Sequence, residues 1–515
     1  MSLNLAILLE TGAASQPHRV AVMHDNRTMT YAQLNEAANC CAAGLARMGV
    51  HLGDKVAVML PNVPEFVVAY FGILKLGGCV VPLNTLHKAS EIAYQLADSD
   101  ASALIVDESL LPEARQALSE VEACHALIVS NGGQPRGRRG QLLAGWRLWD
   151  EVLQSGTAAF DTVQSMPHDA AVILYTAGVV GRPKGAELSH FNLFYNAALT
   201  ADRLLRLTEQ DVSLAVLPLF HSFGQTCVMN ATLYAGGRLV LLPRFEPDKV
   251  LQSIQRERVS VLLGVPTMYW YLLHYPGAEK YDWSSLRLCC SGGAPLSVDL
   301  MQGFEKRYGR PLFEGYGLSE TSPVASFNPP DQPVHPGSIG LPIYGVQMKV
   351  FDDQDRELPP GEVGEIVIRG HNVMKGYYKR PGPTAEAMRN GWFHTGDLGR
   401  IDGEGYFYIV GHKKDIIIRG GLNIYAREVE TALLAHPAVA DVAVVGIPDE
   451  VMGEEVKAFV VLQQDESVDA EELIEYGRSR IAAYKYPRYI EFRTELPKDA
   501  AGKVIKRLLR KSPTT

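Results

Sequence analysis

The chain has 515 residues, of which 47% are hydrophobic and 21% are charged, and its formal net charge at pH 7 is -9. This length predicts several hydrophobic cores rather than one, and the composition is typical of globular proteins. The acidic balance argues against nucleic acid or an anionic membrane surface as a partner, so any phosphate binding must come from local groups.

Short apolar strands alternate with helical patterns along most of the chain. The strands fall at residues 55–60, 103–106, 126–129, 171–175, 214–217 and 259–263. Such alternation predicts stacked α/β layers with largely parallel sheets. Residues 131–140 contain Gly, Pro and Arg without apolar periodicity, which indicates a surface loop.

The pattern changes after about residue 410. Strands near 440–446 and 457–462 and a helix over 470–483 indicate a small α+β unit. We therefore predict an α/β protein with a large N-terminal domain of stacked α/β layers, residues 1–412, and a small mobile α+β C-terminal domain, residues 413–515.

The seven cysteines show no repeated metal-type spacing, which is typical of a reducing compartment. Cys289 and Cys290 fall in a predicted core strand at 286–290, so we interpret them as packing residues rather than nucleophiles. The apolar segment 3–9 is too short to span a bilayer and has no basic flank. We expect a cytoplasmic protein without stable membrane insertion.

The strand at 171–175 leads into a glycine-rich loop that has the frame of a phosphate-binding loop. Gly178, Gly181 and Gly185 allow the backbone N–H groups to surround an anion, and Lys184 adds a positive charge. A Walker loop is excluded, because Pro183 replaces its second glycine and Gly185 replaces its Ser or Thr. Taken alone, the loop could also be an ordinary Gly/Pro turn.

Further motifs follow in a fixed order. They are Ser-Gly-Gly-Ala-Pro-Leu at 291–296, Glu-Gly-Tyr-Gly-Leu-Ser-Glu at 314–320, Thr-Gly-Asp at 395–397 and Gly-His-Lys-Lys-Asp at 411–415. With the glycine-rich loop, they resemble the adenylate-forming superfamily, which includes acyl-CoA synthetases, peptide-synthetase adenylation domains and beetle luciferases. The resemblance covers nearly the whole chain.

This resemblance implies a nucleotide site. The backbone of 293–295 and the ring of Tyr316 would enclose the adenine, Asp397 would bind the ribose, and Ser319 and Glu320 would face the phosphates and a magnesium ion, which prefers such oxygen ligands. The implied nucleotide-binding residues are Gly178, Gly181, Gly293, Ala294, Pro295, Glu314, Gly315, Tyr316, Gly317, Asp397 and His412. The implied catalytic residues are Lys184, Ser319, Glu320 and Lys503, with Glu320 also the metal ligand.

The resemblance also implies two reactions at one site. The C-terminal domain would first present Lys503 to the acyl carboxylate and the α-phosphate. It would then rotate about a hinge at Lys414, so that Gly420 and Gly421 line a tunnel for the pantetheine of CoA. A side chain at Gly421 would fill such a tunnel. The alternatives are a plain Gly-Gly turn and, for Lys503, a solvated helix start.

The segment 217–224 resembles the aromatic motif between the acyl pocket and the pantetheine tunnel. We expect His221 to gate this junction rather than to act as a general base, because a thiol that attacks an acyl phosphate needs little help; a buried structural histidine is the alternative. The predicted pocket is apolar, which favours a bulky hydrophobic acid over an amino acid. The predicted pocket residues are Phe220, His221, Phe223, Thr267 and Tyr269.

The glycine-rich loop departs from the family pattern. Ala177, Val179 and Val180 stand where the family usually has Ser, Thr and Thr, and His412 replaces the arginine that usually meets the ribose. A hydrogen bond to a charged group contributes roughly 1.5–3 kcal/mol, so three missing donors would slow ATP use about a thousandfold, even allowing for non-additivity. The glycines for the second reaction are present, so the predicted loss is confined to nucleotide activation.

We therefore expect an enzyme specialised for thioesterification, which transfers a hydrophobic acyl group from an acyl-adenylate to CoA and releases AMP. A separate adenylating ligase would supply the adenylate, and ATP and Mg²⁺ would be used only if adenylation is retained. The pattern also fits non-adenylating acyl-CoA ligases of platensimycin-type diterpenoid pathways. The alternatives are a complete ATP-dependent carboxylate–CoA ligase, which Lys503 favours, a luciferase-type oxidative enzyme, and a silent module that binds AMP or CoA.

Overall fold

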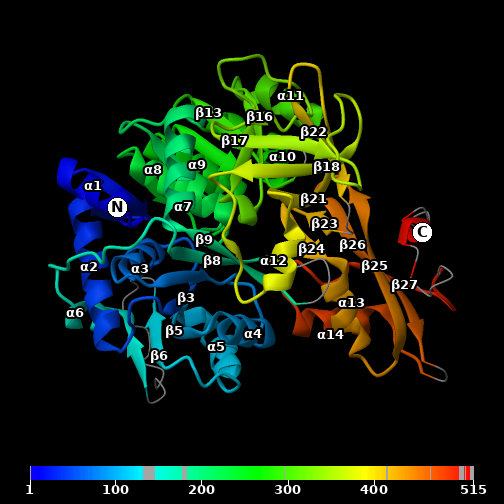
Figure 1. Ribbon diagram of the computed structural model, residues 1–515, viewed down its shortest axis with the longest axis horizontal. Coiled ribbons are helices and arrows are strands. Elements are labelled where there is room, and N and C mark those ends of the chain that lie inside the picture. Colours follow the sequence, from blue (N-terminus) through cyan, green and yellow to red (C-terminus); the bar gives the residue numbers. More distant parts are fainter. Residues whose placement is uncertain are drawn as a thin grey trace.

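The computed structural model describes residues 2–131, 145–176, 182–294, 296–412, 416–463, 466–497, 504 and 506–510 (Figure 1). Within these ranges the chain forms a large N-terminal part with three sheets and a small C-terminal part with a fourth. The α/β fold class with a large and a small domain is therefore confirmed. The boundary predicted between residues 412 and 413 falls between the third and fourth sheets, and its position stays a prediction.

The largest sheet has nine strands in the described chain. Its central strands are parallel, as the alternation of strands and helices predicts, and antiparallel strands lie at both edges. In spatial order the strands are β16 (Leu341–Pro342), β15 (Val324–Phe327), β14 (Leu312–Gly317), β13 (Leu288–Ser291), β12 (Val261–Gly264), β10 (Val212–Ala215), β11 (Arg238–Leu241), β1 (Val20–His24) and β2 (Arg27–Thr30).

The second sheet has eight described strands and lies below the first in Figure 1. It is parallel except for β9 and β19, which pair antiparallel at one edge. In spatial order the strands are β19 (Gly376–Tyr377), β9 (Lys184–Ser189), β8 (Ala170–Thr176), β4 (Cys79–Pro82), β3 (Lys55–Met59), β5 (Ala101–Asp107), β6 (Ala126–Ser130) and β7 (Trp146–Leu148).

The two remaining sheets are smaller. The third is antiparallel and contains β17 (Val346–Phe351), β18 (Gly364–Gly370), β21 (Trp392–Ile401), β20 (Met388–Arg389) and β22 (Phe407–His412). The fourth forms the small domain and contains β24 (Leu422–Tyr425), β23 (Ile416–Arg419), β26 (Gly453–Leu462), β25 (Val439–Asp449) and β27 (Tyr489–Phe492).

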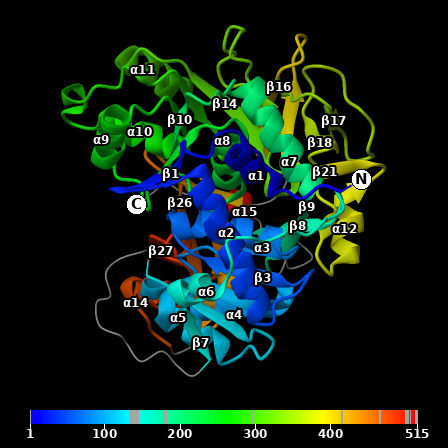
Figure 2. The ribbon, with the colours of Figure 1, turned by 90° about the vertical axis from the view of Figure 1, so that its left-hand side faces the viewer.

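Helices cover the faces of these sheets (Figures 1 and 2). The α-helices are α1 (Ile7–Ser15), α2 (Tyr31–Arg47), α3 (Pro64–Lys75), α4 (Ala89–Ser99), α5 (Leu111–Leu118), α6 (Trp149–Ser155), α7 (His190–Leu199), α8 (Ala231–Tyr234), α9 (Pro247–Glu257), α10 (Pro266–His274), α11 (Val298–Tyr308), α12 (Pro381–Ala387), α13 (Ala426–Leu434), α14 (Ala470–Arg480) and α15 (Lys506–Leu509). Short 3₁₀ helices are η1 (Glu108–Leu110), η4 (Ala278–Lys280) and η5 (Ser319–Thr321), and π-helical segments are η2 (Thr200–Leu204) and η3 (Phe223–Asn230).

Helix α3 joins the cores of the two large sheets. Every residue from Pro64 to Lys75 is buried, which is the pattern of a helix that is covered on all sides. Phe66, Tyr70 and Phe71 belong to a core cluster that also contains side chains from β3 and β4 of one sheet and from β10 and β11 of the other. The N-terminal domain is therefore a continuous layered core.

The sheet of the small domain is covered on both faces. Side chains alternate between the faces of a strand, so Val442 and Val444 pack with α13 and α14, whereas Ala443 and Val445 point to the opposite face. On that opposite face they pack with Leu509 of α15. Helices α13 and α14 are thus separated from the C-terminal segment by the sheet, as Figure 1 shows.

The predicted strands agree with the structure apart from their ends. The clearest difference is the strand predicted at 214–217, because β10 ends at Ala215. The side-chain amide of Asn62 donates to the carbonyl oxygens of Ala215 and Leu217, and its oxygen accepts from the N–H of Leu219. The Asn62 side chain thus makes the backbone hydrogen bonds that a neighbouring strand would otherwise make. The loop predicted at 131–140 lies, except for Asn131, outside the described residues.

All seven cysteines lie in the described chain and are free thiols. Cys289 and Cys290 are buried in β13, and burial raises the pKa of Cys289 to about 12, as expected for packing residues, although Cys290 also lines the cavity described below. Among the described helices, none is both long enough and apolar enough to cross a membrane.

Candidate active site

One large cavity of about 2190 Å³ lies between the N-terminal domain and the small domain. It brings together most of the residues that the motifs pointed to. Those that line it are Lys184, Phe220, His221, Phe223, Gly293, Ala294, Glu314, Gly315, Tyr316, Gly317, Ser319, Glu320, Asp397, Gly420 and Gly421.

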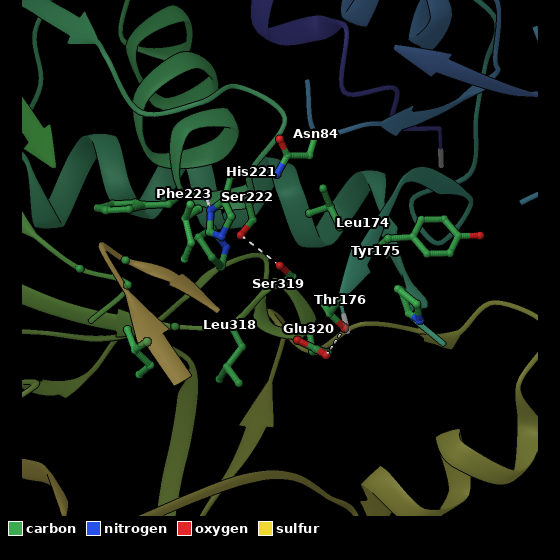
Figure 3. Close-up of a pocket in the computed structure, with 18 of the residues that line it drawn as sticks. Asn84, Leu174, Tyr175, Thr176, His221, Ser222, Phe223, Leu318, Ser319 and Glu320 are labelled. Atoms are coloured by element: carbon green, nitrogen blue, oxygen red, sulfur yellow. Dashed lines mark hydrogen bonds between the residues drawn. The ribbon is translucent and has the colours of Figure 1, made fainter. Parts of the chain in front are cut away.

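Glu320 lies beside the C-terminal end of β8, where the glycine-rich loop begins. Its Oε1 accepts hydrogen bonds from Thr176 Oγ1 at 2.8 Å and from the Tyr377 hydroxyl at 3.0 Å, and the first of these is drawn in Figure 3. Lys184 Nζ lies 4.7 Å from the centroid of the Tyr377 ring. A carboxylate and a cation therefore flank the start and the end of the loop.

This arrangement fits a magnesium ion that is shared with a substrate. Within the described residues, no group of three or more His, Cys, Asp or Glu side chains could hold a metal ion by itself. Mg²⁺ is usually bound by one or two carboxylates together with water and substrate phosphates, and Glu320 is only 8% exposed beside hydroxyl groups. Glu320 and Thr176 are the residues that would hold it.

The implied adenine and ribose residues are connected by a hydrogen bond. The hydroxyl of Tyr316 in β14 donates to Asp397 Oδ2 in β21 at 2.5 Å. The backbone N–H of Asp397 donates to Thr395 Oγ1, and that of Gly396 donates to Glu365 Oε1. The Asp397 carboxylate is therefore held in a fixed orientation at the cavity wall, next to the ring of Tyr316.

Glu314 stands at the buried side of the same wall. Burial raises the pKa of its carboxyl group to about 8, although Oε1 accepts a hydrogen bond from the N–H of Leu296. The carboxyl group is therefore mostly protonated at neutral pH. It ties β14 to the segment that follows β13, which indicates a structural role in the wall rather than a charged site.

The aromatic segment after β10 forms another wall of the cavity. His221 Nδ1 accepts from the N–H of Phe223 at 3.2 Å, and the His221 side chain is exposed to the cavity, where desolvation by the surrounding wall lowers its pKa, so a neutral imidazole faces the cavity. Ser222 Oγ lies 3.5 Å from Ser319 Oγ, as Figure 3 shows. The segment therefore connects the implied acyl pocket to the phosphate side of the cavity.

The apolar end of the cavity includes residues that sequence reasoning missed. Thr200 and Leu204 of η2 and Cys227 of η3 line it, so both π-helical segments border the cavity. Such segments occur often at functional sites. A π-helical turn has no sequence signature of its own, so no pattern could have located these residues.

Two predicted pocket residues lie elsewhere. Tyr269 is fully buried, and its hydroxyl donates to the carbonyl oxygens of Leu262 and Cys290, so its placement in the pocket was wrong. Its neighbour Met268 lines the cavity instead, because adjacent helical residues point in different directions. Thr267 is not among the described residues that line the cavity and lies beside Gly420.

Gly420 and Gly421 form a two-residue hairpin turn between β23 and β24, which we call the glycine turn. Both residues have positive φ angles, +56° and +78°, as such turns require. A Cβ atom on Gly421 would lie 2.6 Å from Cγ1 of Val265 in the N-terminal domain. The small domain therefore touches the cavity wall at a point where only glycine fits.

Several predicted residues lie outside the described residues. They are Gly178, Gly181, Pro295, Lys414 and Lys503, together with the substituted loop positions Ala177, Val179 and Val180. The side chain of His412 is also outside the description, but its backbone pairs in β22 directly opposite Asp397. Their proposed roles stay predictions.

Models of known families match most of the chain. The AMP-binding enzyme model matches residues 9–378, and the model of the AMP-binding enzyme C-terminal domain matches residues 428–503. A long-chain-fatty-acid–CoA ligase of Bacillus subtilis is 40% identical over 531 residues, covering 99% of this chain and 94% of that protein.

Two solved structures illustrate the similarity. One is o-succinylbenzoate CoA synthetase from Bacillus subtilis bound with its product analogue, with a TM-score of 0.86, 32% identity and coverage of 99% of this chain and 98% of that one. The other is ATP-bound MatB from Rhodopseudomonas palustris, with a TM-score of 0.74, 34% identity and 99% coverage of both chains.

The chain therefore belongs to the AMP-binding enzyme family, within the adenylate-forming superfamily, as the motifs predicted. Its fold is that of an acyl-CoA synthetase or ligase. The narrower resemblance to non-adenylating ligases of platensimycin-type pathways is not confirmed by these relatives.

Proposed function

We propose that this acyl-CoA ligase is specialised for thioesterification. It takes a bulky hydrophobic acyl-adenylate, transfers the acyl group to CoA and releases AMP. The observation that carries the proposal is the combination of a phosphate loop without its hydroxyls, at Ala177, Val179 and Val180, with a glycine turn that is docked on the cavity wall.

The orientation of the small domain supports this reaction. The face that carries α13 and the glycine turn lines the cavity, whereas Val504 and Leu509 pack on the opposite face of the small sheet. None of the described residues in 504–510 lines the cavity. Acyl transfer to CoA requires an arrangement in which the glycine turn faces the cavity, as it does here.

The residues of the cavity account for the transfer step. The sulfur of CoA attacks the acyl carbonyl carbon, a C–S bond forms, the bond from that carbon to the phosphate oxygen of AMP breaks with its electron pair, and the thiol proton leaves to solvent. Lys184 would stabilise the charge that develops on the phosphate. Because its pKa is lowered, His221 is neutral and can pack against the acyl group without adding charge.

The substrate and its source follow from the same proposal. The apolar lining of the cavity favours a bulky hydrophobic acid, and a separate adenylating ligase would supply the adenylate. The free thiols, six of the seven buried, are consistent with the cytoplasm, where we place the reaction.

The second candidate is a complete ATP-dependent carboxylate–CoA ligase. The contact between Thr176 and Glu320 and the position of Lys184 favour it, because both suit a bound polyphosphate. Mg²⁺ held at Glu320 would neutralise the polyphosphate charge in that reaction. The similarity to a long-chain-fatty-acid–CoA ligase points the same way.

Replacing Lys503 by alanine tests the proposal. With purified acyl-adenylate and CoA, we expect the variant to form acyl-CoA at a rate within about threefold of the wild type, because the implied role of Lys503 ends once the adenylate exists. The measurement is single-turnover formation of acyl-CoA. A loss of roughly a hundredfold or more would mean that Lys503 takes part in transfer and that the two half-reactions have been assigned to the wrong faces.

A further inference from the structure

A buried lysine joins the two domains beside the cavity. Lys485, which follows α14 in the small domain, places its Nζ 2.8 Å from Oε1 of Glu91 in α4 and 2.7 Å from Oε1 of Glu428 in α13. Its side chain is only 6% exposed. Glu91 belongs to the N-terminal domain, so this ion pair exists only when the domains are docked.

The histidine beside the lysine adds no positive charge. The pKa of His87 is lowered to about 3 by burial and by the charge of Lys485, so its imidazole is neutral. The Tyr484 hydroxyl accepts from the side-chain amide of Asn84 at 3.4 Å, a second contact across the same interface. Burial raises the pKa of Glu428, which leaves Glu91 as an important counter-charge for the lysine.

Glu91 is held rigidly for this contact. Its Oε2 accepts the backbone N–H of Lys88 and caps the N-terminus of α4, while Oε1 accepts from Lys485. On the other side, Glu428 stands in the first turn of α13, directly after the strand that follows the glycine turn. The chain of contacts therefore runs from α4 through Lys485 to the segment that carries Gly421.

Removing one partner of a buried ion pair is strongly destabilising, because the other charge stays out of water without compensation. This penalty applies to Lys485 only while the domains are docked, since rotation of the small domain away from α4 would return Lys485 to water. Loss of the Glu91 charge would therefore disfavour the docked arrangement relative to any other, at the position that fixes the glycine turn.

We propose that Glu91 and Lys485 form an interdomain clamp that positions the glycine turn against Val265 for acyl transfer to CoA. The inference rests on the proposed function in one respect, namely that the docked arrangement is the one that transfers the acyl group. Glu91 is a positioning residue, and it acts through the small domain rather than on the substrate.

The test compares two identical substitutions. Glu91→Gln keeps the shape of the side chain and an oxygen for the Lys88 N–H, but it removes the charge that crosses the interface. Glu491→Gln is the matched control, because Glu491 lies 2.8 Å from the buried Lys457 and both residues belong to the small domain. Both variants are assayed with purified acyl-adenylate and CoA, so the result does not depend on whether the enzyme can use ATP.

We expect Glu91→Gln to lower the transfer rate roughly tenfold, since it shifts the population away from the docked arrangement, while Glu491→Gln stays within about threefold of the wild type. Hydrogen exchange provides a readout besides activity. Backbone amides in residues 416–425 should exchange faster in Glu91→Gln than in the wild type, and at an unchanged rate in Glu491→Gln.

Equal losses of transfer in both variants, or wild-type transfer and exchange in Glu91→Gln, would overturn the clamp. A second variant covers the case in which Glu91→Gln folds poorly. Glu91→Asp keeps the charge but shortens its reach, so a smaller loss than in Glu91→Gln supports the clamp. A loss as large or larger would assign Glu91 to packing and contradict it.

Discussion

Replacing Gly421 by leucine is expected to lower acyl transfer from acyl-adenylate to CoA by roughly 10²-fold or more, because small displacements at a reacting centre have effects of this size. Even the Cβ of the new side chain would lie 2.6 Å from Val265 Cγ1, and the backbone has φ +78°, which L-residues rarely adopt. Either the glycine turn leaves the wall or the side chain fills the path to the acyl group.

A pair of alanine variants separates the clash from the backbone strain. Gly453 has nearly the same φ, +79°, but a Cβ there would meet only an ordinary contact at 3.5 Å. Gly421→Ala and Gly453→Ala should therefore lose similar stability, of about 1 kcal/mol, while only Gly421→Ala slows transfer. Equal transfer rates in the two alanine variants, measured with purified adenylate, would contradict a path to the acyl group beside the glycine turn.

Restoring hydroxyls to the glycine-rich loop should have the largest effect on the other half-reaction. The triple variant Ala177→Ser, Val179→Thr and Val180→Thr adds three hydrogen-bond donors without changing the glycines. If each donor meets a phosphate oxygen, adenylation should rise by on the order of 10²- to 10³-fold. The measurement is exchange of labelled pyrophosphate into ATP in the presence of an accepted acid.

The control for the loop variant is its transfer activity. Transfer from purified acyl-adenylate should stay within about threefold of the wild type, because the loop hydroxyls would serve the β- and γ-phosphates, which the adenylate lacks. Adding His412→Arg should raise exchange further by restoring a ribose contact. The triple variant could fold and transfer normally but still fail to exchange pyrophosphate. The loss of adenylation would then be due to His412 or to closure over Lys503 rather than to the loop.

The sequence predicted the two-domain α/β fold from its alternation of strands and helices, and most of the cavity wall from the resemblance of its motifs to the adenylate-forming superfamily. Thr-Gly-Asp and the segment 314–320 are far apart in the chain, yet Tyr316 and Asp397 share a hydrogen bond. The family resemblance, carried by the motifs and their order, was sufficient to assign these residues to one site.

What the sequence could not provide depends on contacts between distant segments. Tyr269 was misplaced by one helical position, because the local pattern does not tell which side of α10 faces the cavity. The ion pair between Glu91 and Lys485 could not be predicted from the sequence. The two residues are 394 positions apart, and only the docked domains bring them together. The same holds for the raised pKa of Glu314, which depends on its burial.

The most direct measurement uses one enzyme preparation and one hydrophobic acid. It compares the rate of acyl-CoA formation from synthetic acyl-adenylate and CoA with the rate from ATP, Mg²⁺, the free acid and CoA, repeated over a panel of acids of different length and ring content. We predict that the adenylate-started reaction is faster by on the order of a thousandfold, the amount expected from three missing donors. Comparable rates from both starting points, with release of pyrophosphate, would contradict the specialisation for thioesterification and establish a complete ligase.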